Sequence, residues 1–337
     1  MTASADPTDE LFHPVGDHPS WSESYYFNFV DPSTGVGAFT RMGFRPNDGW
    51  ADALHAVYLP GGRVAFTYGR RTDVTPAVVD GFGSSDPAVG NLTLRRGAPF
   101  ASWDIVYAGE AQDVADPTAM LAATKDRPEG WSRPTRLDMD VSFEAISAPH
   151  YAVGGEQGHF EQTGRVSGTI RLDGERWDVD GFGVRDKSWG PRTWQAPSGT
   201  AAKSAGAGAV EQGCFLNWFS MNFGADLALG GACGKTADGT FIGKGWIQRG
   251  DRTIGLDKVT MTTAYDPGNP LLHDTVRLDA VDADGVAIVV DGTVTSICPT
   301  KIPRRDGITF VNEGLARFET DGRVGWGIAE HWHAVTR

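Results

Sequence analysis

The stretch RVSGTIRLDGERWDVDGFGV (165–184) decides the fold class. Val166 and Ile170 belong to an apolar, β-branched run that leads up to Asp173-Gly174, and Trp177 and Val179 follow in a second run of the same kind. An Asp-Gly dipeptide between two such runs is the strongest short-range signal for a β-hairpin. The stretch therefore predicts two antiparallel strands joined by a tight turn.

The same pattern recurs along the chain, and helical periodicity is scarce. Several Asp-Gly dipeptides lie between strand-like runs, and GVAIVVDGTVTSI (285–297) is interpreted as a second hairpin that turns at 291–292. The best helix candidate is DPTAMLAATKD (116–126), with Asp116 as N-cap and Pro117 at the first helical position. These signals predict a mainly β protein built from barrels or sandwiches. The Asp-Gly dipeptides start at positions 48, 80, 173, 180, 238, 284, 291, 306 and 321.

Composition excludes several classes of partner. The formal net charge of the 337 residues is -13, without a block of like charges, which argues against nucleic acid and anionic membranes. No signal peptide and no apolar run long enough for a membrane span are recognised. Cys214, Cys233 and Cys298 lie far apart without a CxxC pair, so we expect reduced thiols and a cytoplasmic protein.

Two β-domains account for the length of the chain. We expect an N-terminal tail over 1–20 and a first β-domain over 21–195, which opens with WSESYYFNFV (21–30). A Gly/Ala-rich loop follows over 196–212. The second β-domain covers 213–337 and begins with the aromatic strand CFLNWFSMNF (214–223).

The segment GFGVRDKSWGPRTW (181–194) combines charges with indoles in a way that neither a surface turn nor a core strand needs. One interpretation is a structural clamp of Arg185, Arg192 and Trp194, in which a guanidinium pairs with a carboxylate and stacks on an indole. The other interpretation is catalytic. Asp186 would be a proton donor if burial raised its pKa more than a neighbouring cation lowered it.

Other polar and aromatic residues extend this candidate site. In a strand over 21–30, Glu23, Tyr25 and Phe27 share one face, while Tyr26 lies on the other. Glu23 and Tyr25 are catalytic candidates beside Asp186. The candidate substrate-binding residues, most of them aromatic residues that ordinarily build a core, are Trp189, Trp218, Tyr26, Phe27, Asn217, Asn222 and Trp332.

No metal or cofactor site is predicted. His331 and His333 form an HxH pair, but zinc needs three or four ligands and the other candidates are scattered. The chain contains no GxSxG, HExxH or GxxxxGK[ST] motif. The scattered candidates are Glu330, Glu313, His150 and His159.

Three stretches carry a resemblance to a known superfamily: WSESYYFNFVDPSTGVGAFTRMGFRPN (21–47), GFGVRDKSWGPRTW (181–194) and GWGIAEHWH (325–333). Over about residues 20–335 the chain resembles bacterial proteins of the carotenoid 1,2-hydratase (hydroxyneurosporene synthase) and AttH-like superfamily. The resemblance implies two consecutive antiparallel lipocalin-like β-barrel domains with very little helix. It also implies hydrophobic substrates and no organic cofactor. The motif positions carried over are Arg185, Asp186, Ser188, Trp189, Gly190 and Arg192, and Lys187 stands where histidine is expected.

Two functions follow from this resemblance. The first is a cofactor-independent enzyme that hydrates, isomerises or cyclises an isoprenoid-, terpenoid- or steroid-like molecule after protonation by Asp186. Trp189 and Trp218 would shield the cation, and Tyr25 or Glu23 would orient water. The alternative is a non-catalytic lipocalin-like carrier of a hydrophobic small molecule, or an accessory protein. In either case the expected partner is a hydrophobic small molecule rather than nucleic acid or a membrane.

Overall fold

The computed structural model describes residues 5–153, 157–192, 213–304 and 307–336. These residues form two compact units, one from the described parts of 1–114 and 132–193, the other from those of 115–131 and 194–337. The loop expected over 196–212 lies outside the described residues. Residues 5–20, expected to be a tail, belong to the first unit, and residues 115–131 group with the second.

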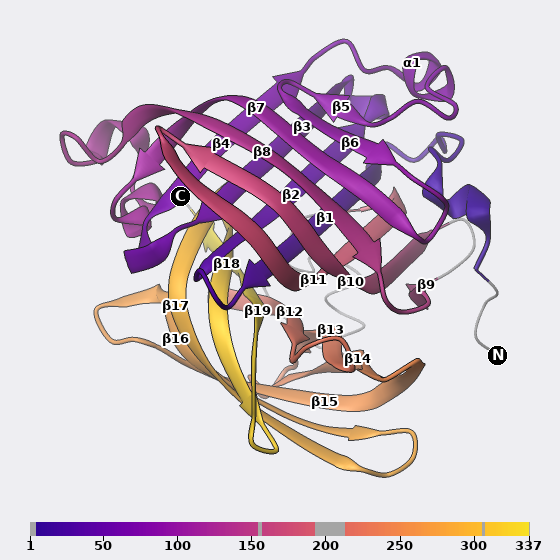
Figure 1. The fold of residues 1–337 in the computed structure, drawn as a ribbon, viewed down its shortest axis with the longest axis vertical. Helices are drawn as coiled ribbons and strands as arrows, with labels where there is room; N and C mark the ends of the chain where they lie inside the picture. The colour runs from indigo at the N-terminus through magenta and orange to yellow at the C-terminus, as the bar shows by residue number, and fades with distance from the viewer. Residues whose placement is uncertain (1–4, 154–156, 193–212, 305–306, 337) are drawn as a thin grey trace. The chain divides into compact units, whose positions relative to one another are not determined.

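Antiparallel strands dominate both units (Figure 1). The strands of the first unit are β1 (Trp21–Asp31), β2 (Val36–Arg45), β3 (Trp50–Tyr58), β4 (Val64–Arg71), β5 (Ala88–Val89), β6 (Leu92–Arg96), β7 (Ser102–Val114), β8 (Arg133–Ala145), β9 (His150–Val153), β10 (Gly158–Leu172) and β11 (Glu175–Pro191). Those of the second are β12 (Gly213–Asn222), β13 (Leu227–Lys235), β14 (Phe241–Arg249), β15 (Arg252–Asp266), β16 (Asn269–Asp282), β17 (Ala287–Arg304), β18 (Gly307–Thr320) and β19 (Arg323–Thr336). The helical turns are α1 (Pro76–Asp80) and the 3₁₀ turns η1 (Pro7–Glu10), η2 (Pro46–Asp48), η3 (Pro60–Gly62), η4 (Pro117–Leu121) and η5 (Thr124–Asp126).

The first unit is one large, strongly curved sheet. Its strands follow the order β4-β3-β2-β1-β11-β10-β8-β7-β6-β5, and β9 pairs with β10. An additional pairing joins β4 to β7 over Val64–Phe66 and Gln112–Val114, so the sheet meets itself at one end. Beyond this pairing β4 and β7 separate, because β7 pairs instead with β6.

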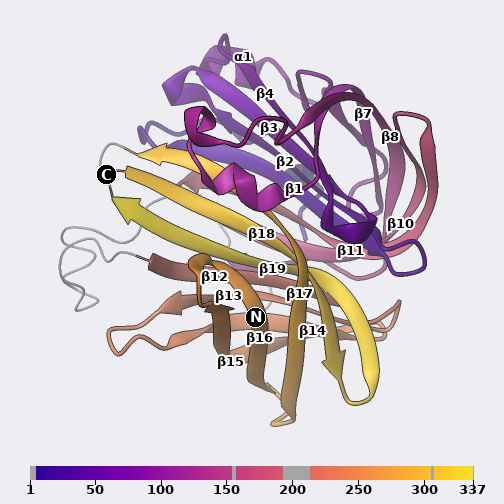
Figure 2. The ribbon, with the colours of Figure 1, turned by 90° about the vertical axis from the view of Figure 1, so that its left-hand side faces the viewer.

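The second unit is a closed up-and-down barrel of the strands β12 to β19 in sequence order (Figure 2). Every neighbouring pair is antiparallel, and β19 returns to pair with β12. Closure of this kind removes exposed sheet edges. The predicted mainly β fold, with lipocalin-like units and very little helix, is confirmed.

The hairpin predicted over 165–184 is confirmed, whereas the one over 285–297 is wrong. Asp173 and Gly174 have φ values of 48° and 90°, as a type I′ turn requires. By contrast, β17 runs straight through Asp291-Gly292. A Cβ at Gly292 would lie 2.7 Å from the Phe318 ring, so this glycine makes room for a core side chain rather than a turn.

The helix expected over 116–126 forms only as the two 3₁₀ turns η4 and η5. Its start is as predicted, since Asp116 accepts a hydrogen bond from the Thr118 amide at 3.0 Å and Pro117 follows as the first helical residue. The short helix α1 was not among the sequence predictions.

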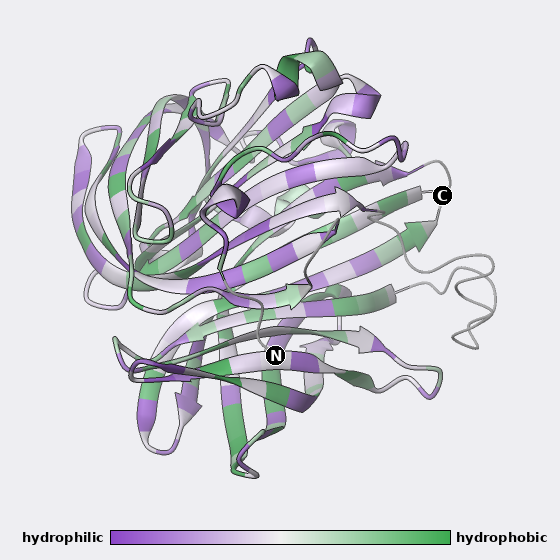
Figure 3. Cartoon of the chain, turned by 90° about the vertical axis from the view of Figure 1, so that its right-hand side faces the viewer, coloured by the Kyte–Doolittle hydropathy of each residue, from purple (hydrophilic) through white to green (hydrophobic). Residues whose placement is uncertain are grey.

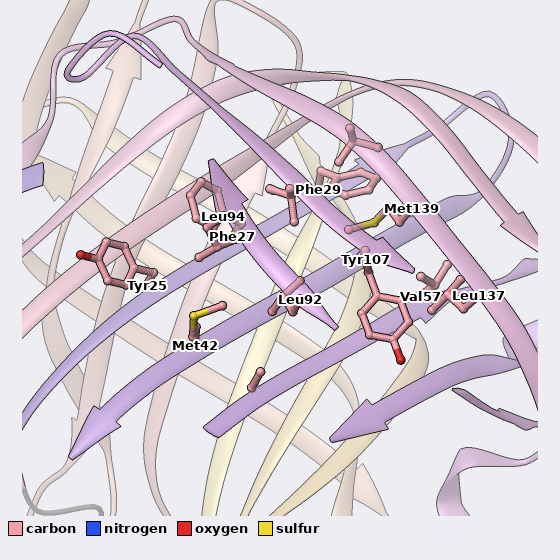
Figure 4. Packing of buried hydrophobic residues seen from close by; sticks show 14 of the residues in the cluster. Tyr25, Phe27, Phe29, Met42, Val57, Leu92, Leu94, Tyr107, Leu137 and Met139 are labelled. Atoms are coloured by element: carbon pink, nitrogen blue, oxygen red, sulfur yellow. The ribbon is translucent and has the colours of Figure 1, made fainter. Parts of the chain in front are cut away.

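Each unit has its own hydrophobic core. Apolar and polar residues alternate along many strands (Figure 3), as expected when one face of a strand is buried. In the first unit Tyr25, Phe27 and Phe29 of β1 pack among side chains from β2, β6, β7 and β8 (Figure 4). In the second unit Phe219 and Met221 of β12 point into the barrel.

The N-terminal segment 5–20 packs onto the inner face of the first sheet. The Phe12 ring lies edge-on to Tyr25 and Phe44, at centroid distances of 5.7 and 4.9 Å. Within the same segment Glu10 is 1% exposed and pairs with Arg185, which is also 1% exposed. The segment thus brings a carboxylate to a guanidinium inside the unit.

We expect Glu10→Ala to lower the free energy of unfolding by about 3–5 kcal/mol, because it leaves the Arg185 charge buried without its carboxylate. Urea unfolding followed by tryptophan fluorescence measures the loss. The double variant Glu10→Met with Arg185→Met should recover most of it, since no charge is then buried. Asp178→Asn, which breaks an exposed pair with Arg176, is the control and should leave stability nearly unchanged. A Glu10→Ala protein as stable as the wild type would contradict this description.

Candidate functional site

Strand β11 presents its motif residues alternately on two faces of the sheet. Residues directly opposite each other on paired strands share a face. Glu23 is opposite Trp189, Tyr25 is opposite Lys187, and Tyr26 is opposite Asp186. Since Tyr25 lies in the core, Lys187 and Trp189 lie on the inner face and Asp186 on the outer face. The inner face is the face that carries the hydrophobic core, and the outer face is the other side of the sheet.

On the inner face, Arg185 binds Glu10 through two hydrogen bonds, one of them 3.0 Å long between Nη1 and Glu10 Oε2. The guanidinium also donates to the Gln162 side chain, with Nε 2.8 Å from Oε1. Its Cζ lies 5.1 Å from the Phe160 ring centroid and 5.8 Å from that of Trp103. A two-pronged carboxylate pair with aromatic stacking is the arrangement that the clamp interpretation describes for Arg185.

Lys187 is fully buried and has its own partners on the inner face. Its ammonium donates to Glu23 and to the Leu11 carbonyl, the latter at 2.7 Å. Burial raises the pKa of Glu23, but the charges of Lys187 and His13 outweigh it, so the Glu23 pKa lies below its usual value. The His13 ring stacks on Trp189 with centroids 3.9 Å apart. The inner face therefore holds an ionised pair of Glu23 and Lys187, beside the stacked rings of His13 and Trp189.

This geometry separates residues that the sequence analysis grouped together. Tyr25, Glu23 and Trp189 lie on the inner face, whereas Asp186 lies on the outer face. Lys187 also points away from Asp186 and is engaged with Glu23, so it does not act as the immediate neighbouring cation considered above. Phe27 lies in the core, 5.8 Å from Trp103 and 5.6 Å from Phe143 between ring centroids.

On the outer face, Asp186 lies beside a second carboxylate and a histidine. Glu161 of β10 is directly opposite Asp186, and His159 is two residues from Glu161. His159 Nε2 is 3.1 Å from Glu161 Oε1, and its Nδ1 is 3.9 Å from Asp186 Oδ1. Glu161 is 3% exposed, and the side chains of Asp186 and His159 are 15% and 17% exposed. One imidazole thus stands between two largely buried carboxylates.

Hydroxyl groups and an aromatic ring flank this carboxylate–imidazole–carboxylate group. Ser188 and Ser24, opposite each other on β11 and β1, share a hydrogen bond of 2.8 Å between their hydroxyls. Arg192 Nη1 donates to the Ser188 hydroxyl of β11 at 2.7 Å, and the Arg192 backbone amide donates to the carbonyl of Ser20, just before β1, at 2.9 Å. Tyr26 lies on the same face and its ring is 6.4 Å from that of Phe39. Trp194, the third clamp candidate, lies outside the described residues.

In the second unit, the predicted residues divide between the outside and the inside of the barrel. Trp218 is opposite Glu330, and Glu330 is opposite Glu313, which places all three on the outside. The Trp332 indole N–H donates to Glu330. Asn222 also lies on the outside, near the end of β12, and its Nδ2 has no hydrogen-bond partner among the described residues.

Inside the barrel, polar side chains form a layer across several strands. Asn217, His331 and Asn312 are opposite one another on β12, β19 and β18, and all three are fully buried. The His273 ring is 3.9 Å from that of His331, and Thr263 Oγ1 is 3.0 Å from His331 Nε2. Buried polar atoms without partners are rare in proteins and mark places for bound water or ligand. Within the described residues those without partners in this layer are Asn217 Nδ2, His273 Nδ1, Asn312 Oδ1, His331 Nδ1 and His333 Nε2.

The histidines of this polar layer are neutral at physiological pH. Burial lowers the pKa of His273 to about 3 and that of His333 to about 4, and it moves that of His331 well below the usual value. Burial likewise raises the pKa of the Cys214 thiol to about 11, so this cysteine is a poor nucleophile. Its thiol donates to Asn217 Oδ1 at 3.0 Å.

Two further observations concern metals and membranes. Within the described residues no group of three or more His, Cys, Asp and Glu side chains could hold a metal ion. None of the described helices has the length and apolar character needed to cross a bilayer. Cys214, Cys233 and Cys298 are free thiols.

Sequence reasoning missed several partners of the predicted residues. Glu10 was placed in a tail, Glu161 was not singled out, and His159 was considered only as a scattered metal ligand. The alternation of side chains along β10 could have predicted that Glu161 and His159, two residues apart, lie on the same face of that strand. The register that sets Glu161 opposite Asp186 can be counted from the turn at Asp173-Gly174. No other sequence signal indicates how β10 pairs with β11.

Two lipocalin-like units in tandem, with an ion-paired inner face and an acidic outer face on β11, define the class of this protein. A family model described as "Domain of unknown function (DUF7064)" matches residues 6–335, and the chain belongs to this family. No curated protein sequence matches the chain.

Solved structures share the fold at low sequence identity. A protein described as AttH from Nitrosomonas europaea is 12% identical with a TM-score of 0.58, covering 96% of this chain and 95% of its own. Kievitone hydratase from Nectria haematococca is 10% identical with a TM-score of 0.52, covering 93% and 89%. CghA, solved with Sch-210972, is 10% identical with a TM-score of 0.51, covering 94% and 89%. The AttH-like fold expected from the sequence is thereby confirmed.

The polar layer predicts that the second unit loses stability in mild acid. A histidine whose pKa is lower in the folded protein than its unfolded value of about 6.5 makes its full contribution to the stability of the fold above pH 6.5. This contribution is lost as the pH falls, because the unfolded chain binds the proton more tightly. For His333, a difference of about 2.5 between the two pKa values corresponds to at most roughly 3 kcal/mol.

Urea unfolding at pH 7 and pH 5 measures this loss. We expect the free energy of unfolding to fall less between the two pH values in His333→Gln than in the wild type. His18→Gln, at an exposed histidine, is the matched control and should behave as the wild type. The same pH dependence in all three proteins would show that the buried histidine is not the cause.

Proposed function

We propose that this protein is a cofactor-independent enzyme that protonates a hydrophobic isoprenoid-, terpenoid- or steroid-like substrate, with Asp186 as the acid. The single observation that supports the proposal best is the group on the outer face of β10 and β11. His159 stands between Glu161 and Asp186, and all three side chains are largely buried. The imidazole is hydrogen-bonded to Glu161, and its Nδ1, 3.9 Å from Asp186, has no hydrogen-bond partner among the described residues. An imidazole in this position between two carboxylates is suited to moving one proton once a small shift or a bridging water closes that distance.

In this proposal each group has a distinct part. Asp186, in its protonated form, gives its proton to one carbon of a substrate double bond, and the electron pair of that bond forms the new C–H bond. The adjacent carbon becomes cationic and is captured by water or by another part of the substrate, or loses a different proton. His159 takes the released proton and returns it to Asp186, while Glu161 holds the imidazole in place through its bond to Nε2.

The surroundings support an apolar substrate. Tyr26 and Phe39 lie on the same face as Asp186, and aromatic faces stabilise a nearby cation. Among proteins of the same fold, one is a hydratase by name, kievitone hydratase. Because identity is only 10%, this similarity supports the reaction class by analogy and does not identify a substrate. Glu23 and Tyr25, proposed above to orient water, lie on the inner face and have no part in this mechanism.

The test is proton transfer to carbon. Purified protein is incubated in D₂O with a terpenoid alcohol, a carotene and a prenylated flavonoid, and products are analysed by mass spectrometry for deuterium on carbon and for added water. We expect labelling of at least one of these molecules. Asp186→Asn should reduce its rate by about 10²–10⁴-fold, the usual contribution of a general acid.

The chain offers a matched control. Asp180→Asn lies on the same strand and the same face as Asp186, but its side chain is 61% exposed and paired with Arg165, so activity should persist. Equal turnover by Asp186→Asn and the wild type would exclude Asp186 as the acid. If no molecule is labelled and native mass spectrometry instead finds a hydrophobic compound bound unchanged, the alternative function as a carrier would be favoured.

A further inference from the structure

A pocket opens in the wall of the first unit, on the side where β4 and β7 separate. Its volume is about 380 Å³, near the lower end of the range for small-molecule sites. It lies beyond the three-residue pairing of Val64–Phe66 with Gln112–Val114, where β4 has lost its partner and β6 has taken its place on β7. The opening is therefore a consequence of the strand pairing.

Small residues leave the volume of this wall pocket empty, and aromatic and aliphatic side chains line it. Ala53, Gly69 and Gly90 carry at most a methyl group there. Among the larger lining residues, from β3, β4, β5, β6, β7 and the turn between β5 and β6, are His55, Tyr68, Val89, Asn91, Leu92 and Tyr107. Two of them, Leu92 and Tyr107, are opposite each other on β6 and β7 and belong to the hydrophobic core shown in Figure 4. The polar groups of the lining are His55, Asn91, Thr67, Glu110 and the tyrosine hydroxyls, and the remaining walls are apolar.

His55 is a buried polar group of this wall pocket that lacks a full set of partners. It is 1% exposed, and its Nδ1 is 2.8 Å from the Thr40 hydroxyl. Its Nε2 has no hydrogen-bond partner among the described residues. The Tyr107 hydroxyl already has hydrogen-bond partners, since it is 2.5 Å from the Glu110 carbonyl and 3.2 Å from Thr67 Oγ1. A buried polar atom without a partner costs stability unless a guest supplies one.

The imidazole is neutral, which fixes the kind of guest it can bind. Burial lowers the pKa of His55 to about 4, so at physiological pH one ring nitrogen donates and the other accepts. Such a ring pairs with a hydroxyl or carbonyl group and offers no charge to a carboxylate or phosphate. The Tyr107 ring lies 5.3 Å from that of His55, tilted by 35° to it, and adds a second aromatic surface beside it.

We propose that this wall pocket binds a compact, uncharged cyclic molecule through one hydroxyl or carbonyl oxygen, which hydrogen-bonds to His55 Nε2. The site is separate from the group around Asp186, because His55 lies on the inner face of the sheet and Asp186 on the outer face. The proposal is also independent of the proposed catalytic function, since it requires only binding.

Isothermal titration calorimetry with thymol and p-cymene tests the proposal. The two probes share one hydrocarbon frame, and only thymol carries a hydroxyl group. We expect thymol to bind in a saturable manner and about 3–10-fold more tightly than p-cymene, the difference that one hydrogen bond supplies. Equal affinities, or no saturable binding of thymol, would overturn the proposal.

Two variants locate the binding. His55→Leu should remove the preference for thymol, and circular dichroism checks its fold. Tyr68 is a lining residue that is 51% exposed and so tolerates substitution. Tyr68→Ala should weaken the binding of both probes without changing the ratio of their affinities. As the control, Tyr151→Phe lies outside the pocket and should bind thymol as the wild type does. An unchanged thymol affinity in both His55→Leu and Tyr68→Ala would place the binding elsewhere and refute the assignment.

Discussion

The pairing of β11 with the N-terminal segment is the interaction on which the first unit depends. Arg185 and Lys187 place two positive charges inside a hydrophobic sheet, which is costly unless each meets a carboxylate. Glu10 meets Arg185, and Glu23 meets Lys187, with the Leu11 carbonyl as a further acceptor. Since Glu10 and Leu11 come from the segment before β1, the inner face of β11 is satisfied only when that segment is in place.

This requirement explains why the motif is so dense in charge. Residues 185, 187 and 189 point inward and stabilise the fold, whereas 186 and 188 point outward, with the alternation of any strand. The structural interpretation of the motif and the proposed catalytic one therefore concern different residues. Arg185 pairs with Glu10 and lies against aromatic rings, whereas Asp186 lies beside the His159 imidazole. The two do not compete for the same side chains.

The fold was accessible from the sequence because it depends on local signals. Asp173-Gly174 fixes a turn, and the β-branched runs around it fix two strands. The same logic failed at Asp291-Gly292, where glycine admits the Phe318 ring and the strand continues. Local residue patterns cannot distinguish a glycine needed for a turn from one needed for packing.

The candidate site was only partly accessible, because it depends on pairing across the sheet. The sequence singles out Asp186 but not Glu161, 25 positions away, which meets it only through the register of β10 and β11. Tyr25 and Glu23 were grouped with Asp186 although their face is opposite, since the register of β1 against β11 is not encoded in either strand alone. The polar layer inside the barrel of the second unit combines side chains of β12, β15, β16, β18 and β19, and no local sequence pattern indicates it.

Hydrogen–deuterium exchange of the N-terminal segment tests this account most directly. If Glu10 and Leu11 are held by β11, the amides of a peptide spanning residues 7–13 should exchange as slowly as those of β1, over hours rather than seconds. Complete exchange of that peptide at the earliest time point, with β1 and β11 still protected, would mean that the segment is not part of the folded unit and that Arg185 has another partner than Glu10.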